Sequence, residues 1–174
     1  MAAKLGITSL LSINFLPNAI HNPKHCISKT LAAAKQYGFP VERIIFEFTE
    51  VEKFSDSRHI KRIVECYQSL GFRTATDDFG SGYSGLNLLA DFQTDIVKLD
   101  MGLIRNIHCD DIRQCIVKHC LGLFSEINIT PLAEGVETRE EFIWLRKAGV
   151  ELMQGYFFAR PGFEHLPTVN FNEH

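Results

Sequence analysis

The chain has 174 residues, of which 45% are hydrophobic and 22% are charged, and its formal net charge is −3. This length allows one domain with a sizeable core, and the composition is ordinary for a soluble globular protein. The small negative charge gives no bulk attraction to a nucleic acid polymer or to an anionic membrane, so we expect neither as a partner. No window of the sequence approaches the about 18 uncharged apolar residues that a membrane-spanning helix needs. The five cysteines are an odd number without the spacing of a disulfide framework, which predicts a cytoplasmic location.

Helix patterns recur along the chain with their usual start and stop signals. Asn22-Pro23 predicts the start of a first helix, which ends at Gly38. Ser55 is predicted to cap a second helix that ends at Gly71. A further helix is expected from about Asp110, and its predicted apolar face consists of Ile112, Ile116, His119 and Leu123.

The last helix is predicted from a capping box formed by Thr138 and Glu141, and Gly149 is predicted to end it. Between the helices lie short segments rich in β-branched residues, which predict strands around residues 9–15, 44–49, 73–78, 95–99, 129–133 and 152–157. Six β/α steps in one direction favour an α/β fold with a parallel sheet and outer helices, either open or closed into a barrel.

Polar side chains lie where these apolar segments end, in successive steps along the chain. They are Asn14, Glu47, Asp77, Asp78, Lys98, Glu134 and Gln154. Because the carboxyl ends of parallel strands meet at one edge, where such folds place their chemistry, we expect these side chains to form one site.

The adjacent acids Asp77 and Asp78 indicate the chemistry of that site. Two neighbouring carboxylates repel each other unless water or cations neutralise them, so the pair alone fits either a solvated turn or a cation site. Its position among further oxygen donors favours the cation site, and hard oxygen ligands suit Mg²⁺ or Mn²⁺. A site this acidic could hold two ions about 3.5–4 Å apart, as in displacement at phosphorus. Lys98 would then hold the attacking water or stabilise phosphoryl charge.

A glycine-rich loop follows these acids directly, and we expect it to approach a substrate closely. Its residues are Phe79, Gly80, Ser81, Gly82, Tyr83 and Ser84. Glu50 could hold this loop by hydrogen bonds or could be an exposed acid, and Glu137 could simply lie in the first turn of its helix. The pairs His108-Cys109 and His119-Cys120 lack zinc-site spacing and are predicted to pack in the core.

Six motifs make the chain resemble the EAL-domain family, the bacterial phosphodiesterases that linearise cyclic di-GMP. These are LSINFLP (11–17), EFTE (47–50), TDDFGSGYSGL (76–86), VKLD (97–100), AEGVET (133–138) and QGYFFARP (154–161). They occur in the family's order and run through nearly the whole chain.

The resemblance implies a role for each matching residue. Metal ligands would be Asn14, Glu47, Asp77, Asp78 and Glu134, with Asp77 as the bridge. The catalytic residues would be Lys98, Glu134 and Asp78, and the partners of the metal shell or of the substrate would be Gln154 and Glu137. Glu50 would anchor the glycine loop, which in the family couples metal binding to dimerisation. The implied reaction is attack of a metal-activated water on one phosphodiester, which gives linear pGpG.

Two features depart from the family pattern. Leu16 stands where a small polar residue is usual, and the Glu-Ala-Leu signature is absent. We therefore expect residues 1–174 to form a single EAL-like domain that lacks its first strands and helices, with an incomplete TIM-barrel-like (β/α) fold. The exposed edges of such a sheet predict a homodimer.

Two functions remain open at this stage. One is an active cyclic di-GMP phosphodiesterase, with a possible upstream sensor domain in a parent protein. The other is a catalytically impaired remnant that binds cyclic di-GMP or a protein partner, because a ligand lost with the signature would weaken one metal site. A two-metal enzyme for another phosphodiester fits the motifs less well.

Overall fold

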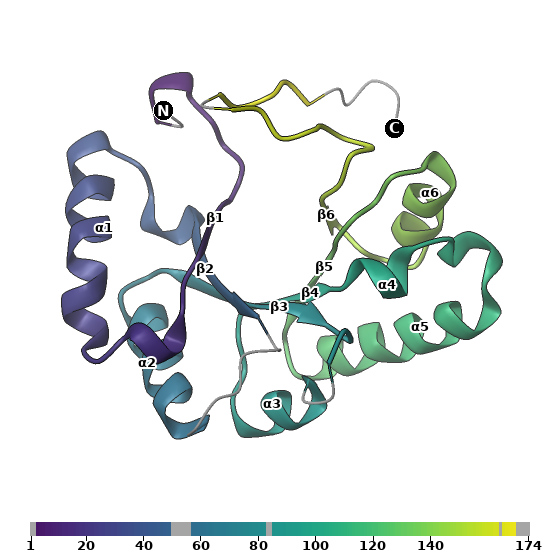
Figure 1. Ribbon diagram of the computed structural model, residues 1–174, viewed down its shortest axis with the longest axis horizontal. Helices are drawn as coiled ribbons and strands as arrows, with labels where there is room; N and C mark the ends of the chain where they lie inside the picture. Colours follow the sequence, from purple (N-terminus) through teal and green to yellow (C-terminus); the bar gives the residue numbers. More distant parts are fainter. Residues whose placement is uncertain (1–2, 50–56, 83–84, 164, 170–174) are drawn as a thin grey trace. The chain divides into compact units, whose positions relative to one another are not determined.

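A computed structural model describes residues 3–49, 57–82, 85–163 and 165–169 (Figure 1). The chain divides into a first compact unit, Met1–Thr76 with Ser84–Asp95, and a second, Asp77–Tyr83 with Ile96–His174. The single domain expected from the sequence stays a prediction. It is tested by urea unfolding of the whole chain, for which we expect one cooperative transition.

Six parallel strands follow one another in the order β1-β2-β3-β4-β5-β6. Their bounds are β1 Leu11–Asn14, β2 Ile44–Thr49, β3 Arg73–Phe79, β4 Ile96–Leu99, β5 Thr130–Ala133 and β6 Leu152–Met153. The predicted α/β class and the number of strands are confirmed. The last strand is shorter than the predicted 152–157, because the chain turns at Gly155, whose carbonyl accepts a hydrogen bond from the Phe158 N–H at 3.1 Å.

In the first unit, three α-helices accompany β1, β2 and most of β3. They are α1 Pro23–Tyr37, α2 Ser57–Ser69 and α3 Gly85–Asp91, with short 3-10 turns at Ala3–Leu5, Pro17–Ala19 and Val41–Arg43. The Asn22 side chain accepts a hydrogen bond from the His25 N–H at 3.2 Å, and Gly38 ends α1 with φ 63°, so both predicted boundaries are confirmed. The predicted cap of α2, Ser55, lies outside the described residues.

Aromatic packing fixes the first two strands against these helices. Phe46 and Phe48 lie on one face of β2 and are both buried, and Ile45 and Glu47 on the opposite face are buried as well. The Phe15 ring, one residue after β1, lies 6.1 Å from Phe46 and 5.6 Å from Phe48. A strand buried on both faces is typical of a parallel sheet covered by helices, and it gives Glu47 a rigid support.

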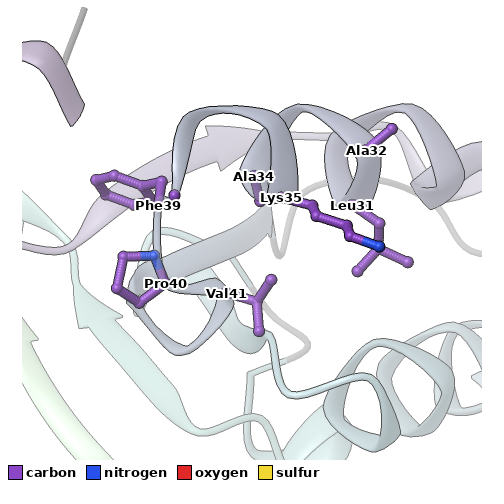
Figure 2. Close-up of a pocket in the computed structure, with 8 residues that line it drawn as sticks. Leu31, Ala32, Ala34, Lys35, Phe39, Pro40 and Val41 are labelled. Carbon is purple, nitrogen blue, oxygen red and sulfur yellow. The ribbon is translucent and has the colours of Figure 1, made fainter.

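An apolar groove of about 510 Å³ lies where α1 ends in this unit (Figure 2). It is lined by Leu31, Ala32, Ala34, Lys35, Gly38, Phe39, Pro40 and Val41. Lys35 is the one charged residue of this lining, so the groove lacks the oxygen donors that the expected chemistry needs.

The second unit contains β4 to β6 and the helices between them. They are α4 Met101–Ile104, α5 Asp111–Glu126 and α6 Arg139–Lys147, with a 3-10 turn, η4, at Ile107–Cys109. Asp110 caps α5 by accepting hydrogen bonds from two backbone N–H groups, and Thr138 and Glu141 form the predicted capping box of α6. No described helix is long and apolar enough to span a bilayer.

The predicted apolar face of α5 is wrong. The helix buries Val117 and Phe124, whereas Ile112 and Ile116 are 71% and 43% exposed. This helix carries two apolar stripes, and periodicity alone does not say which one faces the sheet. The histidine–cysteine pairs predicted to pack in the core are also misplaced, because His108 and His119 are both exposed.

Candidate active site

The second unit brings several predicted site residues together at the ends of its strands. They are Asp77 and Asp78 in β3, Lys98 in β4, Glu134 directly after β5 and Gln154 directly after β6. The ladder continues beyond the strands, because the Glu134 N–H donates to the Leu99 carbonyl at 3.2 Å and the Gln154 N–H donates to the Ala133 carbonyl at 2.9 Å. These bonds hold the backbone of Glu134 beside β4 and that of Gln154 beside β5.

Lys98 is the centre of this group. Its ammonium Nζ lies 2.9 Å from Asp77 Oδ1 and 2.7 Å from Glu134 Oε1. The three side chains are only 5%, 12% and 13% exposed, so these are ion pairs with little solvent around them. The Gln154 amide Nε2 donates to the same Glu134 oxygen at 2.5 Å. The contacts fix the Glu134 carboxylate from two sides.

The pKa values of Lys98 and Glu134 depend on the position of one cation beside two acids. Burial by itself would lower the pKa of Lys98, but its hydrogen bonds to Glu134 and Asp77 outweigh that effect and raise it. For Glu134, burial raises the pKa to about 7, even though Lys98 acts in the opposite direction, and the Asp77 charge adds to the rise. Lys98 therefore stays charged at neutral pH, while Glu134 exchanges its proton near pH 7.

The adjacent acids Asp77 and Asp78 face one site because the backbone departs from regular strand geometry between them. Asp78 has φ 56°, in the left-handed region that few non-glycine residues adopt, and its N–H donates to Asp77 Oδ1 at 2.9 Å. Asp77, Asp78 and Glu134 each offer a carboxylate oxygen, and these oxygens lie within 4.8 Å of one another. Three hard oxygen donors this close could hold a divalent cation.

The glycine loop begins in the core and then leaves it. Phe79 is 5% exposed and packs edge-on against Phe124, with ring centroids 5.4 Å apart, so it anchors the loop. Gly80 has φ 96°, and a Cβ there would lie 2.6 Å from a methyl group of Leu103, so only glycine fits. Ser81 and Gly82 are exposed. The predicted loop residues Tyr83 and Ser84, and the predicted anchor Glu50, lie outside the described residues.

In the first unit, two further predicted ligands are neighbours on adjacent strands. Asn14 of β1 lies in register with Glu47 of β2. Glu47 is 5% exposed, and its carboxylate accepts a hydrogen bond from the Ser12 hydroxyl. Ser12 was not among the predicted site residues, although its spacing of two from Asn14 places both side chains on one face of the strand.

Glu137 is held by Arg105, which was also not among the predicted site residues. Arg105 Nη1 lies 2.8 Å from Glu137 Oε2, and the Glu137 side chain is 43% exposed. Glu141, predicted only as part of a cap, has no exposed surface and accepts backbone hydrogen bonds from two separate segments. No local pattern indicated either tertiary contact.

Comparison with protein families gives one match, in which the family described as EAL domain matches residues 1–161. The blue light- and temperature-regulated antirepressor BluF of Escherichia coli is 35% identical over 172 residues, which are 99% of this chain and 42% of that protein. The cyclic di-GMP phosphodiesterase PdeR of Escherichia coli is 34% identical over 125 residues, which are 72% of this chain and 18% of that protein. The chain spans less than half of the length of both relatives.

Two solved structures resemble the chain closely. The standalone versatile EAL protein from Vibrio cholerae O395, in its c-di-GMP bound form, is 72% identical, with a TM-score of 0.91 over 98% of this chain and 72% of that one. BlrP1 of Klebsiella pneumoniae, in a manganese/cy-diGMP complex, is 36% identical, with a TM-score of 0.83 over 92% of this chain and 41% of that one. These likenesses confirm the predicted TIM-barrel-like α/β class.

Proposed function

The chain belongs to the EAL-domain family, and on that premise we propose that it hydrolyses cyclic di-GMP to linear pGpG. The observation that carries the proposal is the Lys98 ammonium placed between the Asp77 and Glu134 carboxylates, beside Asp78. The V. cholerae protein that is 72% identical was solved with c-di-GMP bound, which supports the substrate.

The donor set fits a divalent cation, and we propose Mg²⁺ or Mn²⁺. Its chemistry is that of hard ligands, namely the carboxylates of Asp77, Asp78 and Glu134 within 4.8 Å of one another. The BlrP1 complex that resembles this chain contains manganese, which supports the same class of ion. We propose Asn14 and Glu47 as further ligands. When bound, such ions neutralise phosphoryl charge and lower the pKa of a coordinated water.

The chain's own residues would supply charge and orientation. Lys98 stays cationic and would stabilise negative charge as it develops on the phosphoryl oxygens. Without a cation, burial holds the pKa of Glu134 near 7, and a bound cation would lower it, so ion binding at neutral pH would release a proton from this carboxyl. Gln154 keeps the Glu134 carboxylate oriented by its amide hydrogen bond. Among the loop residues, Gly80 lets the loop turn at φ 96° against Leu103, where a Cβ would clash.

A second function has its own support. BluF, which is 35% identical over 99% of this chain, is an antirepressor and thus acts through another protein. The alternative is a catalytically impaired domain that binds cyclic di-GMP or a protein partner. BluF and PdeR are longer than the matched segment, and a sensor domain upstream in a parent protein stays part of the proposal.

The homodimer and the cytoplasmic location are parts of the proposal as well. Ile112 and Ile116 form an exposed apolar stripe on α5, which a second copy could cover. Light scattering of the chain and of a double variant, Ile112→Ser with Ile116→Ser, tests this, and a monomeric unmutated chain would refute it. The five cysteines, all in the described part of the chain, are free thiols, which supports a reducing compartment.

The test of catalysis is chromatography of cyclic di-GMP after incubation with the protein and Mn²⁺. We expect pGpG from the unmutated chain and none from Asp77→Ala, since that change removes a ligand and an ion-pair partner of Lys98. Asp111→Ala, at an exposed acid on α5, is the matched control and should stay active. Cyclic di-GMP binding by calorimetry without any pGpG from folded protein would favour the alternative.

A further inference from the structure

Glu141 is a buried charge that the proposed chemistry does not use. It lies in the first turn of α6 and has no exposed surface, the lowest value among the charged residues that the structure describes. A buried carboxylate is costly unless hydrogen bonds or opposite charges compensate it. The groups that contact the Glu141 carboxylate therefore indicate which parts of the structure it stabilises.

The two carboxylate oxygens of Glu141 contact two different segments. Oε2 accepts hydrogen bonds from the N–H groups of Glu137 at 2.9 Å and Thr138 at 3.1 Å. Oε1 accepts a hydrogen bond from the Asn106 N–H at 2.9 Å and lies 3.8 Å from Arg105 Nη1. One carboxylate thus joins the segment after β5 to the turn after α4.

The turn after α4 is in a conformation that needs such support. Asn106 has φ 56°, in the left-handed region, which costs energy for a non-glycine residue. Burial raises the pKa of Glu141, but the backbone N–H groups and Arg105 outweigh this effect and lower it, so the group is ionised at neutral pH. It can then accept hydrogen bonds on both oxygens at once.

The segment that Glu141 holds is the one that carries Glu134. On its strand side, the Val136 N–H donates to the Gln154 carbonyl at 3.1 Å. Gly135 has φ 64°, and a Cβ there would lie 2.6 Å from Met101 of α4. Glu141 fixes the far end of the same segment. Residues 134–138 are therefore held along their whole length, with little freedom for Glu134.

We propose that Glu141 is a positioning residue, whose carboxylate sets the backbone of residues 134–138 and so places Glu134 beside Lys98 and Glu137 beside Arg105. The proposal rests on the phosphodiesterase function proposed above. The competing interpretation is that Glu141 only caps α6, as its hydrogen bonds to Thr138 would by themselves suggest. A cap alone would affect stability and leave the kinetics unchanged.

Two variants and a control separate these interpretations. Glu141→Gln keeps the shape but places an NH₂ donor against one set of N–H groups, so it can hold only one of the two segments. Glu141→Ala holds neither. Glu140→Gln changes an exposed acid one residue away in the same helical turn and serves as the matched control.

The kinetic test compares kcat and KM with cyclic di-GMP and Mn²⁺, below the Tm of every variant. We expect kcat to fall about 10–100-fold in Glu141→Ala and less in Glu141→Gln, with little change in KM, as for other residues that orient ligands of a metal site. Glu140→Gln should match the unmutated chain. If Glu141→Ala does not fold, Glu141→Gln alone decides. A kcat within twofold of the unmutated chain in the folded Glu141 variants would overturn the proposal.

A Mn²⁺ titration by calorimetry gives a readout that does not depend on turnover. A displaced Glu134 should weaken Mn²⁺ binding about tenfold in Glu141→Ala and leave it unchanged in Glu140→Gln. If the unmutated chain makes no pGpG, the proposed function fails, yet the titration still tests positioning. Equal Mn²⁺ affinity in the unmutated chain and the Glu141 variants would then refute the role of Glu141.

Discussion

Replacing Lys98 by methionine tests the electrostatic account of the site most directly. Methionine has a similar length and can fill the buried space, but it removes the charge that lies 2.9 Å from Asp77 and 2.7 Å from Glu134. Two acids at a site with little solvent would then face each other without a cation. Removing one partner of a buried ion pair usually costs about 3–5 kcal/mol.

The structure also predicts how this cost depends on pH. Without Lys98, the folded protein can avoid two neighbouring charges by keeping a carboxyl group protonated. Glu134 is the group that would stay protonated, because its pKa is already about 7 in the unmutated chain. Keeping it protonated costs ~1.4 kcal/mol for each pH unit above about 7, which is less than ~1 kcal/mol near pH 7.5 and nothing near pH 5.

The assay is urea denaturation of the metal-free chain and of Lys98→Met at both pH values. We expect a loss of about 3–5 kcal/mol near pH 7.5 that is smaller by less than ~1 kcal/mol near pH 5. Lys61→Met, at an exposed lysine of α2, is the control and should change stability by less than ~0.5 kcal/mol. A loss in Lys98→Met no greater than that in Lys61→Met at either pH would refute the reasoning, because the buried ion pairs would then contribute nothing measurable to stability.

Four further substitutions test neighbouring parts of the structure. The pKa of Glu134 is raised in the folded chain from 4.5 to about 7, so its contribution to stability is full below about pH 4.5 and is lost as pH rises through about 7. This amounts to ~3 kcal/mol in the metal-free protein, and in denaturation across that range Glu134→Gln should be flatter than the unmutated chain. Gly155→Ala should lower stability by ~2 kcal/mol or more, because a Cβ there would overlap the Val136 backbone, whereas Gly122→Ala in α5 has open space and should stabilise by ~0.5–1 kcal/mol. Thr138→Ala should cost ~1 kcal/mol through loss of the α6 cap, and an unchanged Tm would contradict the capping geometry.

The elements that could be predicted from the sequence are those with local chemical signals. Asn22 and Gly38 bound α1 as expected, because a side-chain acceptor and a left-handed glycine act within one turn of the helix. The face of α5 could not be predicted in the same way. Val117 and Phe124 are buried while Ile112 is exposed, and this choice depends on how the helix meets the sheet.

For the site, the position of polar residues at strand ends was enough to bring Asp77, Lys98 and Glu134 together. Parallel strands force such residues to one edge, so the prediction needed only the strand pattern. The strand pattern did not predict the orientation of each side chain. The left-handed backbone of Asp78 and the amide bond from Gln154 to Glu134 appear only once the loops have their tertiary neighbours.

Glu141 shows why a correct local prediction can still be incomplete. The spacing from Thr138 identifies a capping box, and the capping box is present. The same spacing would occur if the glutamate lay on the surface, where its loss would cost little. Glu141 differs from such a surface glutamate because it is completely buried and accepts a hydrogen bond from Asn106, 35 residues earlier in the chain. Glu141 both caps α6 and holds a distant turn beside the segment that carries Glu134. We therefore expect its replacement to lower kcat as well as Tm.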